Sequence, residues 1–258
     1  MKSISLYVEN GSYLTKIHPF TKLIYIITAI VTAVISGQLM VYGLFILLSL
    51  ATLVSGKLIK KVFPLIVFSF TILITIFLIH GLFNQNNNQV LFTIFGLKFY
   101  KEGLLYASRI GLNILNMLLS FAILVLTTKP SVLVDELEMI GMSPKFGYII
   151  ISVFQIIPQM IGTFHTITDA QRSRGLETEG NLFTRIKAFI PLISPVVMSS
   201  LINTRERAVA LEVRGFGAKC QKTYLQHQRV TLRDKVIMCL LVLCMIFAIV
   251  GRVLVWNS

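Results

Sequence analysis

The chain has 258 residues, of which 55% are hydrophobic and only 14% are charged, and its formal net charge is +13. A soluble domain of this length normally carries about a quarter charged residues, whereas the apolar runs here reach the roughly 20 residues that a helix needs to cross a bilayer. Composition therefore excludes an ordinary soluble protein and predicts a polytopic membrane protein. We interpret the positive charge as the basic bias of cytoplasmic loops and not as a nucleic-acid-binding surface.

Residues 1–22 are mixed and polar, with no apolar core of the kind found in a cleaved signal peptide, so the first apolar run is interpreted as a retained anchor. We predict five transmembrane helices. The shortest of them would span the bilayer with the help of tilt or of snorkelling side chains at their ends. They cover approximately residues 23–35, 39–54, 62–83, 103–126 and 236–255.

The third and fourth predicted spans are joined by a loop, 84–102, that begins with a run of asparagine and glutamine. Residues 90–100 are rich in β-branched and aromatic side chains and contain a central glycine, a pattern typical of a small β-hairpin. We expect this hairpin to lie at the outer surface of the membrane.

Lysine and arginine are concentrated before the first span, in the loop after the second span (Lys57, Lys60 and Lys61), and throughout residues 129–235. The positive-inside rule places these regions in the cytoplasm, with the N-terminus inside and the C-terminus outside. The expected organisation is therefore four spans in 1–128, a cytoplasmic helical domain in 129–232, and a final span in 233–258.

The cytoplasmic region is rich in Ile, Leu, Phe and Met, which is not typical of a disordered segment. It predicts three helices, each with recognisable start and stop residues. The first would run from Pro130 to about Ile140 and end at Gly141, the second from Ser143-Pro144 to Arg174, and the third from Asn181 to Arg214. Proline inside a helix disturbs it, so we expect a kink or break at Pro158 and bends at Pro191 and Pro195.

Two of these helices end in the same way, with an arginine followed by a glycine: Arg174-Gly175 and Arg214-Gly215. A helix C-terminus carries partial negative charge and unpaired carbonyls, which favour a cationic side chain there. Glycine lets the chain turn away, so that the planar guanidinium is free to bind a partner's carboxylate in a bidentate manner. One such end is ordinary capping, but two matched ends on apolar cytoplasmic helices favour a docking role.

With these motifs in view, nearly the whole chain resembles the transmembrane T component of energy-coupling factor (ECF) transporters. His18, Pro19 and Lys22 are similar to that family's entry to the first span, and Lys129-Pro130 precedes the short acidic helix. Phe154-Gln155-Ile156-Ile157-Pro158 precedes the first Arg-Gly end. The family's Ala-Arg-Gly signature is represented by Ser173-Arg174-Gly175 and Val213-Arg214-Gly215, both without the alanine.

The resemblance implies a non-catalytic subunit in a bacterial inner membrane, working with two ATP-binding subunits and a substrate-capture S component in vitamin or metal-ion uptake. Arg174, Gly175, Arg214 and Gly215 would dock the ATPase subunits with help from Arg172. Asp169, Ser173 and Glu212 would be supporting residues. ATP and Mg²⁺ would be bound by the partners, and this chain would hold no cofactor and no metal.

Two other functions are weighed against this one. A membrane-embedded enzyme would need clustered catalytic groups, but the four histidines are scattered, there is no phosphate-binding glycine loop, and we interpret Asp135, Glu136 and Glu138 as solvated helix acids or partner contacts. A stand-alone carrier would place ionisable groups inside its spans, but the predicted spans are nearly free of them, Arg109 being the main exception. This favours a scaffold whose spans pack against other proteins.

Overall fold

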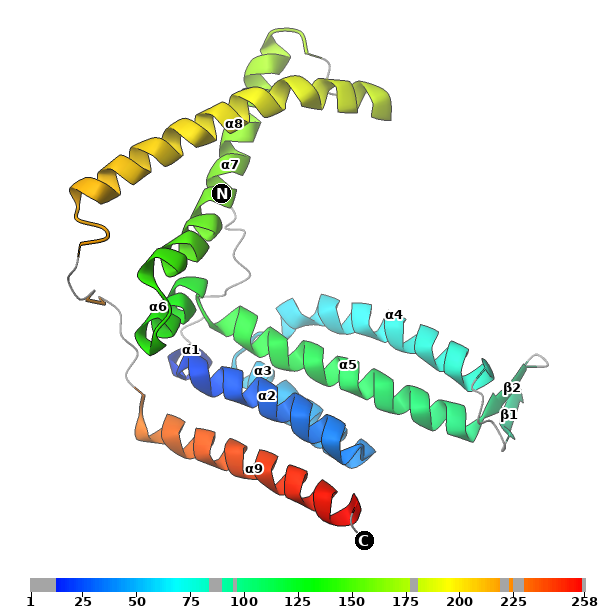
Figure 1. Ribbon diagram of the computed structural model, residues 1–258. Helices are drawn as coiled ribbons and strands as arrows, with labels where there is room; N and C mark the ends of the chain where they lie inside the picture. Colours follow the sequence, from blue (N-terminus) through cyan, green and yellow to red (C-terminus); the bar gives the residue numbers. More distant parts are fainter. Residues whose placement is uncertain are drawn as a thin grey trace. The chain divides into compact units, whose positions relative to one another are not determined.

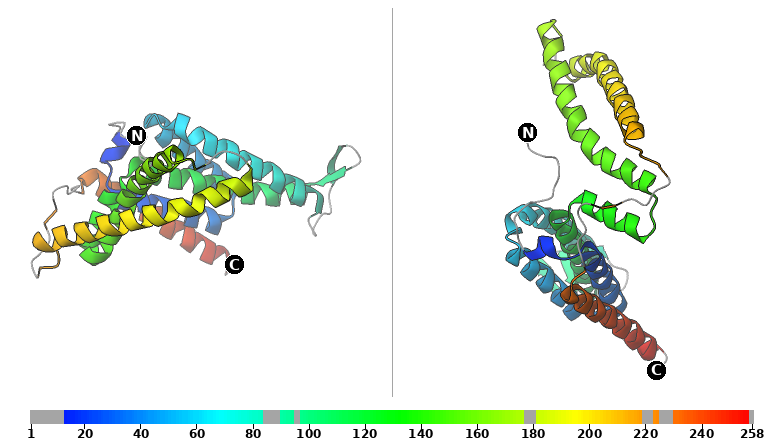
Figure 2. Two further views of the ribbon diagram at one scale, coloured as in Figure 1. Left: turned by 90° about the horizontal axis from the view of Figure 1, so that it is seen from above. Right: turned by 90° about the vertical axis from the view of Figure 1, so that its left-hand side faces the viewer.

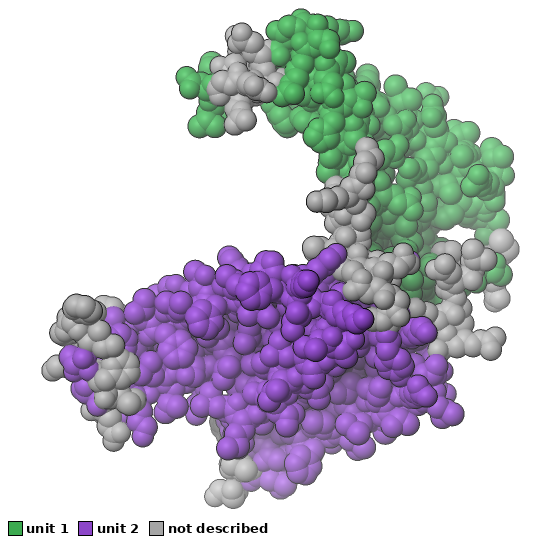
Figure 3. All heavy atoms as spheres, turned by 180° about the vertical axis from the view of Figure 1, so that it is seen from behind, with its two compact units in different colours: residues 1–4, 130–227 green, residues 5–129, 228–258 purple. Residues whose placement is uncertain are grey.

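The computed structural model describes residues 13–83, 90–94, 97–176, 181–218, 223–224 and 230–256. These residues are helical apart from turns and one two-stranded sheet (Figure 1), which confirms the prediction of an all-α polytopic membrane protein. The chain divides into two compact units, coloured separately in Figure 3. Residues 5–129 and 228–258 form one, which we call the membrane unit, and residues 1–4 and 130–227 form the other, which we call the α6–α8 unit.

The membrane unit contains the helices predicted as spans. They begin and end within a few residues of the predicted limits, and a short helix that the sequence analysis did not predict, α1 (Tyr13–Lys16), precedes them. The others are α2 (Pro19–Ser36), α3 (Leu39–Ser55), α4 (Ile59–Phe83), α5 (Lys101–Thr127) and α9 (Leu232–Trp256).

Local sequence sets the limits of α2. Its N-cap is His18, whose ring Nδ1 accepts a hydrogen bond from the backbone N–H of Phe20 at 3.3 Å, and Pro19 occupies the first turn, where its missing N–H costs nothing. The helix ends at Gly37, whose φ of +60° suits glycine.

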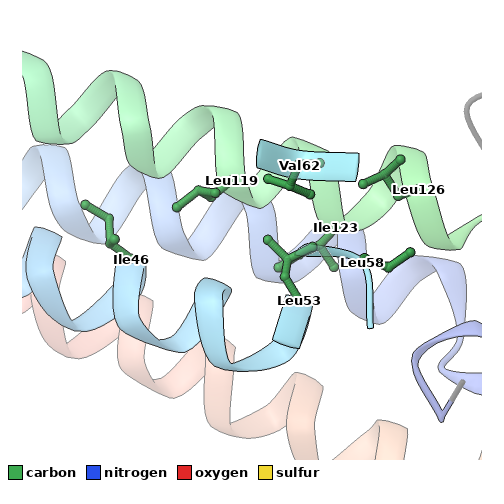
Figure 4. Packing of buried hydrophobic residues seen from close by; sticks show 8 residues of the cluster. Ile46, Leu53, Leu58, Val62, Leu119, Ile123 and Leu126 are labelled. Atoms are coloured by element: carbon green, nitrogen blue, oxygen red, sulfur yellow. The ribbon is translucent and has the colours of Figure 1, made fainter. Parts of the chain in front are cut away.

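The core of the membrane unit lies between α3, α4 and α5 (Figure 4). It is an apolar cluster with members from all three helices and, through Leu58, from the turn between α3 and α4: Ile46, Leu53, Leu58, Val62, Leu119, Ala122, Ile123 and Leu126. Two close contacts tighten the packing around α5. Gly111 lies so near Leu73 of α4 that an added Cβ would be 2.1 Å from the leucine Cδ2, and the buried Asn116 side chain donates a hydrogen bond to the carbonyl of Ala29 in α2 at 2.8 Å.

The predicted hairpin is present. Strands β1 (Val90–Ile94) and β2 (Leu97–Tyr100) pair antiparallel, with Val90 opposite Tyr100 and Ile94 opposite Leu97. They connect the end of α4 to the start of α5 and lie at one end of the membrane unit (Figure 1). The asparagine-rich stretch, 84–89, lies outside the described residues.

The second unit contains α6 (Pro130–Ile140), α7 (Pro144–Ser173) and α8 (Leu182–Val213), which match the three helices predicted for this region. Ser143 caps α7 by accepting a hydrogen bond from the N–H of Phe146 at 3.3 Å, whereas Asn181 stands at the cap position of α8 without a side-chain cap bond. Pro158 does not break α7, and Pro191 and Pro195 likewise lie inside an uninterrupted α8.

Within the described residues, six helices are long and apolar enough to cross a membrane, and they include α7 and part of α8. By contrast α3, predicted as a span, has only 17 residues, or about 26 Å of helix. Length and hydropathy alone therefore do not distinguish the predicted spans from the two long helices assigned to the cytoplasm by charge.

Candidate functional site: two arginine-tipped helix ends

The C-terminus of α7 forms a complete Schellman motif. Arg174 is the C-cap residue, and Gly175 follows with a φ of +88°. The Gly175 N–H donates to the carbonyl of Arg172 at 2.9 Å, and the Leu176 N–H donates to the carbonyl of Gln171 at 3.0 Å. These two bonds satisfy carbonyls that a helix end would otherwise leave unpaired.

The C-terminus of α8 repeats this geometry bond for bond. Arg214 is the C-cap residue, and Gly215 has a φ of +78°. The Gly215 N–H donates to the carbonyl of Glu212 and the Phe216 N–H to that of Leu211, each at 2.9 Å. The two arginines thus occupy equivalent positions in equivalent backbone motifs.

The arginine distinguishes these two ends from a third. Helix α6 also ends in a Schellman-type turn, in which the Gly141 N–H donates to Glu138 and the Met142 N–H donates to Leu137. The residue before this glycine is Ile140, the last residue of α6 and not a cation. The glycine turn is therefore a common way of ending a helix in this unit, and the cationic tip belongs to α7 and α8 alone among its three helices.

Both tips are exposed. The side chains of Arg174 and Arg214 are open to solvent, and within the described part of the chain neither guanidinium takes part in a hydrogen bond or ion pair. A planar group with five donors at the negative end of a helix dipole is suited to bind a carboxylate on another molecule. A glycine immediately behind it leaves room for the partner surface to approach.

The predicted supporting residues lie around these ends. Arg172, Asp169 and Glu212 are exposed, and the hydroxyl of Ser173 donates to the carbonyl of Asp169 at 3.0 Å within the helix. The Ser173 hydroxyl therefore bonds to its own helix backbone. The docking role predicted for all these residues stays a prediction.

Helices α7 and α8 cross and contact one another (Figures 1 and 2). At the crossing, the Arg207 guanidinium of α8 donates to the side-chain oxygens of Gln155 and Gln159 of α7, at 3.5 and 3.2 Å, and the rings of Phe164 and Phe189 lie 5.7 Å apart. Sequence reasoning did not single out Arg207. The available signal was the pair of glutamines four residues apart on one helix face.

The second tip is also tied to the start of α7, because the ring of Phe216 packs against that of Tyr148 with centroids 5.1 Å apart.

The interpretation of the acidic residues of α6 as solvated is partly wrong. Glu136 and Glu138 are buried, with 4% and 6% exposure. Glu138 accepts a hydrogen bond from the hydroxyl of Tyr224 at 3.2 Å and packs against Gly147, so it is a structural residue and not a solvated one.

In the described residues, no group of three or more His, Cys, Asp or Glu side chains lies close enough together to hold a metal ion. The features of the α6–α8 unit that stand out chemically are therefore the two arginine tips and the polar crossing that holds their helices together.

The sequence matches the family model described as CbiQ, cobalt transport protein, over residues 10–225. It is also similar to bacterial proteins named energy-coupling factor transporter transmembrane protein EcfT. The relative from Staphylococcus aureus is 29% identical over 93% of this chain and 92% of its own length, and that from Lactococcus lactis is 26% identical over 94% and 95%. The relative from Bacillus subtilis is 28% identical over 83% and 84%.

Proposed function

This chain belongs to the CbiQ cobalt transport protein family and is the transmembrane component of an energy-coupling factor transporter. We propose on this basis that it couples two ATP-hydrolysing subunits to a substrate-capture S component. The observation that carries the proposal is the pair of exposed arginines in matching Schellman motifs at the ends of α7 and α8. In this proposal Arg174 docks one ATPase subunit and Arg214 docks the other.

The S component would bind the apolar faces of the same two helices. On α7 the exposed residues Phe146, Ile149, Val153, Ile157 and Ile161 recur every three or four positions, which places them on one helix face. On α8 a similar exposed series includes Ile186, Ile190, Ile193, Val197 and Leu201. Such a large apolar area supports contact with a membrane-embedded partner, and movement of the arginine tips would move it.

The partner subunits carry out the chemistry. ATP and Mg²⁺ are bound and used in the ATPase subunits, and this chain transmits the resulting motion for the uptake of a vitamin or a metal ion. The cytoplasmic placing of the N-terminus and of the α6–α8 unit is part of the same proposal. It is supported by the exposed lysines Lys57, Lys60 and Lys61 between α3 and α4, and by Lys16 and Lys235.

The test is a pull-down of the tagged chain from detergent-solubilised native membranes, followed by mass spectrometry. We expect two ATP-binding subunits and one or more small membrane proteins to co-purify. Arg174→Ala and Arg214→Ala should each weaken ATPase binding by about 2–5 kcal/mol, because truncation leaves the partner's carboxylate unpaired. The double variant should nearly abolish uptake.

Arg205→Ala is the matched control, since Arg205 is an exposed arginine on α8 that lies away from the tip. It should retain the ATPase subunits at the wild-type level. Recovery of the chain alone, or equal recovery of partners by the wild type and the double variant, would reject the docking role and favour an enzyme or a stand-alone carrier.

A further inference from the structure

The chain leaves the membrane unit after Lys129 and returns to it at Gln228, so the α6–α8 unit is attached at two points. Beside these points, the start of α2, the end of α5 and the start of α9 lie at one end of the membrane unit (Figure 1). Polar groups from these three helix ends are hydrogen-bonded to one another. We call them the junction cluster: His18, Lys22, Thr127, Thr128, Thr231 and Asp234. Three of them are titratable and deeply buried, since His18, Lys22 and Asp234 are 2%, 5% and 3% exposed.

Lys22 contacts the end of α5, where the chain leaves the membrane unit. Its Nζ donates to the backbone carbonyl of Thr127 and to the hydroxyl oxygen of Thr128, both at 3.1 Å. Thr127 is the last residue of α5, so its carbonyl has no acceptor role within the helix and lies at the negative end of the helix dipole. The ammonium thus fixes the end of α5 immediately before the chain leaves the membrane unit.

Asp234 contacts the start of α9, where the chain returns to the membrane unit. Its Oδ2 accepts hydrogen bonds from the N–H and the hydroxyl of Thr231, and the Asp234 N–H faces the Thr231 hydroxyl oxygen at 3.4 Å, which together form a capping box at the start of α9. Its other oxygen, Oδ1, accepts from the backbone N–H of His18 at 3.4 Å.

Stability alone does not explain this arrangement. Buried charges are costly to desolvate, and well-packed apolar residues are often equally stabilising in their place. The charged groups add a defined geometry. Lys22 joins the start of α2 to the end of α5, and Asp234 joins the start of α2 to the start of α9.

We propose that Lys22 and Asp234 are positioning residues that hold the two attachment points, Thr128 and Thr231, as one fixed base for the α6–α8 unit. This inference rests on the proposed coupling function. When ATP drives the α6–α8 unit, a fixed base lets that unit move as a body relative to α5 and α9. Without the junction cluster the two attachment points move separately, and ATP hydrolysis no longer produces a defined displacement.

The experiment uses the complex of the full chain with its co-purified ATPase subunits in lipid nanodiscs. In a background with the native cysteines replaced by serine, spin labels at Lys60→Cys and Thr166→Cys, both exposed positions, report the distance between the two units by pulsed electron paramagnetic resonance. We compare Lys22→Met, Lys22→Arg and Thr128→Val with Lys16→Met. The last is a matched control, because Lys16 is an exposed lysine close by on α1.

We expect the wild type and Lys16→Met to show a distance change on addition of ATP. Lys22→Met should retain the ATPase subunits and their hydrolysis rate but lose the defined distance change. Lys22→Arg should restore it, and Thr128→Val should weaken it. Amide exchange at the end of α5 and the start of α9 should rise about tenfold or more in Lys22→Met, the effect of removing charged hydrogen bonds.

The outcomes separate the two proposals. A wild-type complex that binds no ATPase, or that shows no change with ATP, contradicts the coupling function itself. A normal ATP-dependent change in both Lys22→Met and Thr128→Val overturns the present inference alone. A second pattern of results also overturns it. If Lys22→Met loses ATPase binding, Lys22→Arg does not restore that binding and Thr128→Val behaves as wild type, the junction cluster is only a folding element.

Discussion

At the residue scale, Gly175 and Gly215 set how the chain turns away behind each arginine tip, because both adopt positive φ angles, +88° and +78°. A side chain at such a backbone conformation is strained by about 1–2 kcal/mol. We predict that Gly175→Ala or Gly215→Ala reduces ATPase recovery in the pull-down, and that Asn at the same position reduces it less, because asparagine tolerates positive φ. The control is Gly43→Ala, inside α3, where an added Cβ meets nothing within 4 Å.

Equal ATPase recovery by the alanine and asparagine variants would contradict this account of the tips. These ends were predictable from sequence because an arginine, a glycine and a helix stop are all local signals. The burial of Glu138 was not, since it depends on Tyr224 and on the missing side chain of Gly147, which come from other parts of the chain. Arg207 and its two glutamine partners were missed for the same reason.

At the element scale, α4 and α5 pack together where Gly111 of α5 accepts the side chain of Leu73 of α4. Small residues let helices approach closely in a membrane. We predict that Gly111→Ala lowers the stability of the purified chain by about 1–3 kcal/mol, the usual cost of overpacking. Adding Leu73→Ala should recover part of the loss, measured as the thermal unfolding midpoint in detergent.

A double variant less stable than the sum of its two single changes would argue against this contact. The helices themselves were predictable to within a few residues from apolar runs, caps and glycine stops. Pro158, Pro191 and Pro195 each lie inside continuous helices, so the break considered at Pro158 does not occur, and the kink there and the bends at the other two prolines stay predictions. Proline removes one backbone donor, but the helix persists where its remaining bonds and its packing outweigh that loss.

At the scale of the whole molecule, hydropathy and charge give different assignments for α7 and α8. Both are long and apolar enough to cross a membrane, yet they carry Arg172, Arg174, Arg205, Arg207 and Arg214, and the positive-inside rule places such segments in the cytoplasm. If α7 crossed the membrane, the start of α8 would lie on the outer side. Because α8 begins at Leu182, which is 77% exposed, a label at that residue shows whether α7 crosses the membrane.

We predict that, in a cysteine-free background, an impermeant maleimide applied to intact cells labels Thr93→Cys but neither Lys60→Cys nor Leu182→Cys, and that all three are labelled after lysis. Thr93 is exposed on β1, in the hairpin between α4 and α5. The orientation that we predict from the positive-inside rule places Thr93 on the outer side and Lys60, near the start of α4, on the inner side. The α6–α8 unit can bind cytoplasmic ATPase subunits through both tips only if α7 does not cross. Labelling of Leu182→Cys in intact cells would place Arg174 on the outer side of the membrane, away from the cytoplasmic ATPase subunits, and rule out joint docking.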